Sequence, residues 1–240
     1  MSKKLLLAAS LAASSVFLAA PVALAQTEAG ALSPAAQRFG TLFVPTELSI
    51  ETAVAGFNKE FEPAMRADAN VVALDQRFPG LIEVAGNAGR STMERVLRAR
   101  IPETQRRVGA LAATRLSPAE LDVTNAYLGS PAGQRLQRIM AETADGSALT
   151  QTIRDTGEIP QMDGKQVMAM VNPAALSRLS KEDLSALIQF SASPAGRKFD
   201  AAGGPFAELV ASEMNVMIEA MKPEIEQAVT TAIMAHLGRK

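Results

Sequence analysis

Two carboxylates occupy equivalent positions of a sequence pattern that occurs twice in this 240-residue chain. Glu120 belongs to the stretch LSPAEL, and Asp183 belongs to the later stretch LSKEDL. Two carboxylates that face one cleft could work as acid and base, as they do in glycoside hydrolysis. However, each follows a serine, Ser117 or Ser180, by three residues, where a carboxylate stabilises the start of a helix. We therefore expect both carboxylates to be structural.

Each copy of the pattern continues with an aromatic residue, the letters S-P-A-G and a basic residue. The serines predict helix N-caps, and the prolines predict first helical residues, where the missing N–H costs nothing. Glycine inside the next helix costs ~1 kcal/mol relative to alanine, which predicts close approach to a neighbouring helix. The residues concerned are Tyr127, Ser130, Pro131, Gly133 and Arg135, and then Phe190, Ser193, Pro194, Gly196 and Lys198. The pattern predicts two helical hairpins and an internal duplication, with Gly129 as a left-handed helix end.

Other catalytic chemistry has few candidate residues. The chain has no cysteine, which excludes thiol catalysis and thiolate metal sites. Its one histidine, His236, lies near the C-terminus, and none of the motifs G-x-S-x-G, H-E-x-x-H, G-x-G-x-x-G or the phosphate-binding P-loop occurs. We therefore expect a non-catalytic protein without cofactor or metal.

Methionine thioethers can bind copper(I), so the methionines of the last helical segment need an explanation. Met214, Met217 and Met221 lie on one helical face and continue its apolar stripe. Methionine also fills gaps between packed helices, because its side chain is flexible. The spacing favours core residues, and a methionine-lined groove that binds a small apolar ligand is the alternative.

Seven arginines lie between residues 90 and 115, where only Glu94 and Glu103 are acidic. This local excess could contact an anionic envelope surface, for which the best candidates are Arg95, Arg98 and Arg100. A solvated helix face with internal ion pairs is the more common arrangement. The net charge of −1 favours no nucleic-acid partner.

The N-terminus has the organisation of a Sec signal peptide over residues 1–25. Lys3 and Lys4 precede an apolar run that ends at Ala20, and Ala23-Leu24-Ala25 matches the small-x-small cleavage pattern. Cleavage there predicts a periplasmic or secreted protein that does not span a membrane. Residues 26–38 are expected to be a flexible tail.

The remaining chain, residues 39–240, is rich in helix-forming residues and has no segment of strand-like alternation. It predicts a single all-α domain, a compact bundle of helical hairpins with repeats at about 116–142 and 179–209. Residues 91–94 form a capping-box pattern that predicts a helix start, and Pro102 predicts a boundary between two helices.

The repeated motif resembles that of a family of secreted bacterial all-helical domains of unknown function. It consists of L-S-x-x-E-L, an aromatic residue and S-P-x-G-x-K/R. The closest stretches are residues 116–135 and 179–198. Many members have Phe-Tyr before S-P, whereas this chain has Tyr127-Leu128 and Phe190-Ser191. The resemblance implies an exported helical module and supplies no catalytic residue.

We therefore expect an interaction or structural module of the cell envelope, with an envelope protein or an anionic envelope surface as its partner. A carrier of a small apolar ligand is the alternative, and the sequence leaves the oligomeric state open.

Overall fold

The computed structural model describes residues 31–144, 161–169 and 173–238, and the expected signal peptide lies outside these ranges. Every regular element within them is helical, which confirms the all-α prediction. None of these helices is both long and apolar enough to cross a membrane. The elements are α2 (Pro34–Phe43), α3 (Thr46–Arg66), α4 (Ala69–Arg77), α5 (Leu81–Arg115), α6 (Pro118–Leu128), α7 (Pro131–Thr143), α9 (Gly164–Ala169), the 3-10 helix η1 (Pro173–Arg178), α10 (Lys181–Ala192), α11 (Pro194–Ala201) and α12 (Gly203–Leu237).

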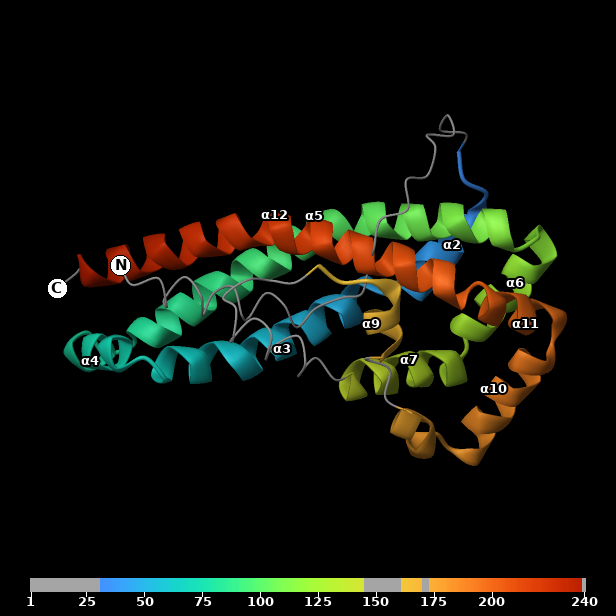
Figure 1. Ribbon diagram of the computed structural model, residues 1–240, viewed down its shortest axis with the longest axis horizontal. Helices are drawn as coiled ribbons and strands as arrows, with labels where there is room; N and C mark the ends of the chain where they lie inside the picture. The colour runs from blue at the N-terminus through green and yellow to red at the C-terminus, as the bar shows by residue number, and fades with distance from the viewer. Residues whose placement is uncertain (1–30, 145–160, 170–172, 239–240) are drawn as a thin grey trace.

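Two helices of 35 residues each, α5 and α12, lie antiparallel and side by side along the long axis of the molecule (Figure 1). Their apolar side chains form the main core together with those of α2 and α3. Glu213 of α12 is buried here, and its carboxylate accepts hydrogen bonds from Thr104 at 3.2 Å and Arg107 at 2.8 Å. Because an unpaired buried charge would be costly, this contact favours one register of the two helices.

Two predicted boundaries within α5 are wrong. The helix begins at Leu81, directly after Gly80, whose φ of 89° is left-handed, and it continues through Ser91 and Pro102 without a break. The helix stays continuous because residues on both sides of Pro102 are buried in the core, among them Leu97, Ile101 and Val108. Packing of a long apolar face outweighs the hydrogen bond that proline removes.

The flexible tail expected up to residue 38 ends earlier. Ser33 caps α2, and its Oγ accepts a hydrogen bond from the N–H of Ala36 at 3.3 Å. Ala36 and Phe39 are fully buried, so this short helix belongs to the core.

The S-P-A-G stretches form tight corners between α6 and α7 and between α10 and α11. In the first corner the hydroxyl of Ser130 donates to the carbonyl oxygen of Tyr127 at 2.7 Å and accepts from the N–H of Gly133 at 3.1 Å. The same two hydrogen bonds recur in the second corner, at 2.6 and 3.0 Å, through Phe190, Ser193 and Gly196. Each proline is the first helical residue, so the predicted caps are confirmed.

Both corners need glycine, because the carbonyl oxygen that accepts the serine hydrogen bond lies where a Cβ atom would be. A Cβ atom on Gly133 would overlap the carbonyl oxygen of Tyr127, and one on Gly196 would overlap that of Phe190. The close approach predicted from the sequence is therefore present, and the neighbour is the preceding helix of the same hairpin.

Two details of the hairpins differ from the prediction. Gly129 has φ of −80° and is not left-handed, because the extended backbone of Ser130 turns the chain instead. The second hairpin ends at Ala201 rather than near residue 209, because α12 begins at Gly203.

Replacement of either corner glycine by alanine should destabilise the protein. We expect Gly133→Ala and Gly196→Ala each to lower the free energy of unfolding by about 1–3 kcal/mol, because the added methyl group overlaps backbone atoms. Urea unfolding followed by circular dichroism measures this. Gly204→Ala is the control, since no atom lies within 4 Å of its Cβ position and alanine favours a helix. Equal stability of all three variants would contradict the role given to the corner glycines.

Candidate functional site

The two hairpins pack on each other reciprocally. Helix α7 of the first hairpin contacts α10 of the second, and α11 of the second contacts α6 of the first. Tyr127 and Phe190, which hold equivalent positions in the two copies, stack with ring centroids 4.3 Å apart and planes 4° from parallel. The aromatic position of the motif is therefore a contact between the two copies.

The charged motif positions cross between the hairpins in the same way. Lys198 of the second copy lies 2.8 Å from an Oε atom of Glu120 in the first. Arg135 of the first copy forms a two-point ion pair with Asp183 of the second, with Nε to Oδ2 at 2.9 Å. Since Glu120 is equivalent to Asp183 and Arg135 to Lys198, the pattern is that of two units related by a two-fold axis. We call this arrangement the paired hairpins.

These contacts keep both carboxylates ionised. The hydrogen bond from Lys198 lowers the pKa of Glu120 to about 2, aided by the backbone N–H of Ser117. The hydrogen bond from Arg135 lowers the pKa of Asp183 to about 2, aided by Ser180. Groups with such pKa values hold no proton near neutral pH, so they are unsuited to acid catalysis. Their position fits the structural role predicted from the sequence.

The outer face of α6 is covered by α2. Four α6 residues one helical turn apart are buried, at 0–6% exposure: Leu121, Thr124, Asn125 and Leu128. The side-chain amide of Asn125 donates to the carbonyl oxygen of Ala35 in α2 at 2.8 Å. Gln137 of α7 donates to the carbonyl oxygen of Leu42, near the end of α2, also at 2.8 Å. Helix α2 is therefore held on the first hairpin along its length.

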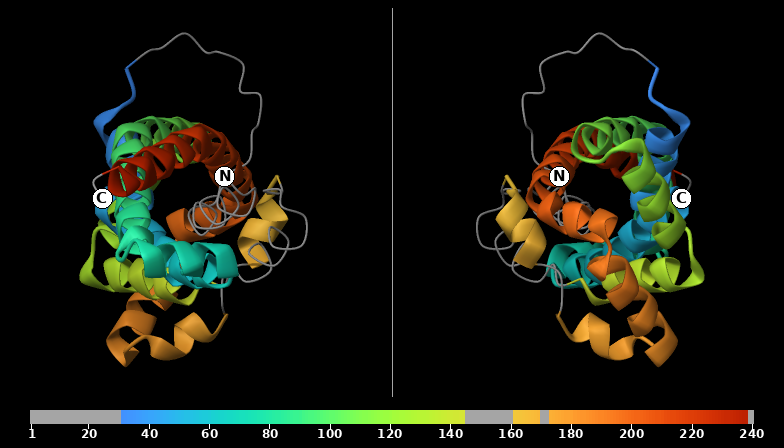
Figure 2. Two further views of the ribbon diagram at one scale, coloured as in Figure 1. Left: turned by 90° about the vertical axis from the view of Figure 1, so that its left-hand side faces the viewer. Right: turned by 90° about the vertical axis from the view of Figure 1, so that its right-hand side faces the viewer.

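The equivalent face of α10 is exposed. Leu184 and Ile188, which correspond to Leu121 and Asn125, are 40% and 59% exposed. Leu187 is half-buried and Ser191 is exposed. In the part of the chain that the structure describes, no helix takes the place on α10 that α2 takes on α6. We call Leu184, Leu187, Ile188 and Ser191 the uncovered α10 face. Helix α10 lies at the outer edge of the molecule (Figure 2).

The uncovered α10 face was not predicted from the sequence. Leu184 and Leu187 gave no sign of exposure, because an apolar stripe looks the same in a sequence whether or not a neighbouring helix covers it. The one sign of it in the sequence is a difference between the copies. At the position of Asn125 the second copy has the more apolar Ile188, which indicates a different neighbour for that helix face.

The candidate arginines are largely paired with acids from other helices. Arg95 binds Glu224 of α12 at 2.7 Å, and Arg98 binds Glu47 of α3 at 2.6 Å. Arg100 is exposed and has no ion-pair partner among the described residues. Two of the three positive charges are therefore partly neutralised where they meet solvent, which weakens the attraction expected for an anionic surface.

The candidate methionines lie in the core. Met214, Met217 and Met221 are 1%, 4% and 0% exposed, and they pack in the cluster shared by α5 and α12. They therefore occupy the positions that the apolar stripe predicts.

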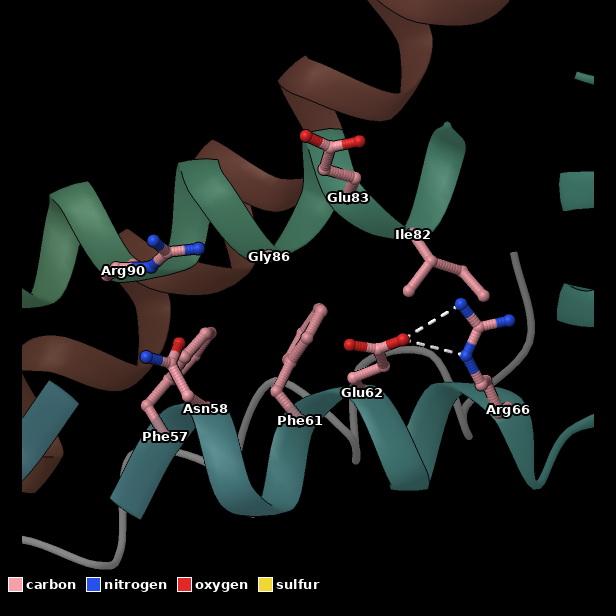
Figure 3. Close-up of a pocket in the computed structure, with 9 residues that line it drawn as sticks. All are labelled: Phe57, Asn58, Phe61, Glu62, Arg66, Ile82, Glu83, Gly86 and Arg90. Atoms are coloured by element: carbon pink, nitrogen blue, oxygen red, sulfur yellow. Dashed lines mark hydrogen bonds and ion pairs between the residues drawn. The ribbon is translucent and has the colours of Figure 1, made fainter. Parts of the chain in front are cut away.

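An open cleft of about 420 Å³ lies between α3 and α5 (Figure 3). Phe57 and Phe61 stack on one side, with ring centroids 4.8 Å apart, and Ile82 lies opposite. Glu62 and Arg66 form an ion pair of 2.8 Å on the rim, whereas the Nε of Arg90 is buried and has no hydrogen-bond partner in the described structure. The cleft can hold a small molecule with an apolar part and a polar end.

Residues 31–144, 161–169 and 173–238 contain no group of three histidine or acidic side chains that could hold a metal ion. The ring Nε2 of His236 lies 3.2 Å from the carbonyl oxygen of Pro79, so the histidine joins the end of α12 to the turn before α5.

No protein-family model, curated protein or solved structure matches the chain. The features that bear on function are therefore the paired hairpins, the uncovered α10 face and the cleft between α3 and α5.

The paired hairpins should make stability depend on pH in acid. The folded pKa values of Glu120 and Asp183 are lower than those of unfolded chains, so their contribution is complete near neutral pH and is lost as the pH falls toward 2. We expect the urea midpoint to fall between about pH 4.5 and about pH 2.5, and to fall less in the double variant Glu120→Gln, Asp183→Asn. The exposed Glu182→Gln should keep the wild-type dependence. An equally steep fall in the double variant would contradict this assignment.

Proposed function

We propose that the protein is an exported, non-catalytic interaction module of the cell envelope. The paired hairpins are its platform, and the uncovered α10 face is the surface that contacts a protein partner. The observation that carries this proposal is the difference between two equivalent helix faces, one buried under α2 and one exposed.

The distribution of exposed apolar side chains supports this choice. Six large apolar side chains are 40% exposed or more among the described residues, and three of them lie on η1 or α10: Leu176, Leu184 and Ile188. Exposed apolar residues scattered singly are ordinary, whereas Leu184 and Ile188 lie one turn apart on the same helix, as residues of an interaction site do. The pairing with α6, α7 and α11 holds this group in a fixed position.

The sequence supplies the setting of this proposal. The signal peptide pattern supports a partner in the periplasm or outside the cell. An internal duplication accounts for the reciprocal contacts of the paired hairpins, and the motif supports membership of the secreted helical family that it resembles. In this view the two copies diverged after duplication, and the second kept an open face.

A second candidate function, a carrier of an apolar ligand, is favoured by the cleft between α3 and α5. Its stacked Phe57 and Phe61 offer an apolar surface, and the unpaired Nε of Arg90 offers a hydrogen-bond donor to an anionic end. The ligand class is a single-chain amphiphile such as a fatty acid. This candidate differs from the methionine-lined groove expected from the sequence, because the cleft contains none of those methionines.

The interaction module is tested by placing a photo-crosslinking amino acid at the uncovered α10 face in cells. With p-benzoylphenylalanine at Ile188 we expect a covalent adduct to another protein, found by mass spectrometry after irradiation. The matched control is the same residue at Val123, an exposed apolar position of α6 with 47% exposure against 59% for Ile188. Adducts of equal yield at both positions, or at neither, would refute the proposed function.

The carrier function is tested by titration with dodecanoate, followed by isothermal calorimetry. We expect saturable binding to the wild type and loss of binding in Gly86→Leu, because a side chain at Gly86 points at Phe61, 3.4 Å from its Cβ position. Gly203→Leu, which adds the same side chain where no atom lies within 4 Å, is the control. No heat of binding with the wild type, or equal binding by both variants, would remove this candidate.

A further inference from the structure

We infer that the partner binds the uncovered α10 face through an amphipathic α-helix that carries a basic residue at one end. This inference rests on the proposed function and names the kind of segment that the surface accepts. The guide is α2, which lies on the equivalent face of α6 within the same chain.

The two faces have the same register. Four α6 positions within two turns are buried, Leu121, Thr124, Asn125 and Leu128, and α6 packs against α2, to which Asn125 donates a hydrogen bond. The corresponding α10 positions are Leu184, Leu187, Ile188 and Ser191, and both hairpins have the same corner geometry. A surface that one helix covers in the first copy therefore has the shape to accept a helix in the second.

The chemistry of the face differs at the two positions that bind the backbone of α2. Where Asn125 donates to the carbonyl oxygen of Ala35, the second copy has Ile188, which favours an apolar side chain in contact. Where Gln137 donates to the carbonyl oxygen of Leu42, the second copy has Asp200, which is exposed.

The carboxylate of Asp200 has no ion-pair or hydrogen-bond partner among the described residues. A carboxylate accepts hydrogen bonds and cannot donate one when ionised, so it repels the carbonyl oxygens at the end of a helix placed like α2. It attracts a lysine or arginine instead. The expected segment therefore has an apolar stripe for Leu184 and Ile188 and a basic residue next to Asp200.

A second copy of this chain is a poorer occupant. Stable protein dimers bury roughly 800 Å² per partner, far more than a few apolar side chains on one short helix provide. The chain's own α2 is not free to bind there, because its Ala36 and Phe39 are fully buried in the core. A helix from another protein needs only a narrow face, as α2 does on α6.

The experiment continues from the crosslink at Ile188. Mass spectrometry of the adduct identifies the attached segment, and a synthetic peptide of that segment is titrated into the purified full chain by fluorescence anisotropy. We expect an amphipathic, helix-forming sequence with a lysine or arginine. Its affinity should fall at least tenfold in Ile188→Glu and at least threefold in Asp200→Lys, and should stay unchanged in the control Val123→Glu. Circular dichroism shows that each variant is folded.

Three results would overturn the inference while leaving the proposed function intact. They are a captured segment without amphipathic helical pattern, capture of a second copy of this chain, and peptide binding that Ile188→Glu leaves unchanged. If the segment lacks a basic residue, or if Asp200→Lys does not lower its affinity, the proposed contact between Asp200 and a basic residue of the partner is wrong. Absence of any protein adduct at Ile188 overturns both the inference and the proposed function.

Discussion

The reciprocal contact of the two hairpins is the constraint on which the arrangement of α6, α7, α10 and α11 depends. Glu120 acts twice, because its carboxylate accepts a hydrogen bond from the N–H of Ser117 at the start of α6 and also binds Lys198 of the other hairpin. At the equivalent position, the N–H of Asp183 donates to the hydroxyl of Ser180, and its carboxylate binds Arg135. In each copy the aromatic residue follows the acidic position and precedes the basic one, and the two rings, Tyr127 and Phe190, stack on each other. The serine, glycine, aromatic and charged positions of the repeated motif thus either close a corner or join the copies.

The aromatic contact also connects the hairpins to the rest of the fold. The ring of Phe190 lies 5.9 Å from that of Phe199 in α11, which in turn contacts Phe39 of α2 and Phe206 of α12. The chain of rings runs from the hairpin interface into the main core. Because α2 covers α6 and also joins this cluster, the first copy is absorbed into the core, whereas the outer face of the second copy stays open.

Local features could be predicted from the sequence, and features that depend on distant neighbours could not. Ser130 and Ser193 were identified as caps because their partners lie three residues away in the chain. Ser91 and Pro102 misled the prediction, because burial of α5 along its length outweighs local signals for starting or ending a helix. The pairing of Arg98 with Glu47 depends on how α3 packs, so the sequence showed only an excess of charge. The uncovered α10 face was hidden for the same reason.

The position of one aromatic ring gives the protein an optical property of its own. The chain has a single tyrosine and no tryptophan, and that tyrosine is Tyr127, stacked on Phe190 between the hairpins. The intrinsic emission of the unmodified protein therefore comes from the hairpin interface. Separation of the hairpins changes the surroundings of this ring, whereas local opening elsewhere leaves them as they were. Tyr127 therefore reports on the contact between the two hairpins.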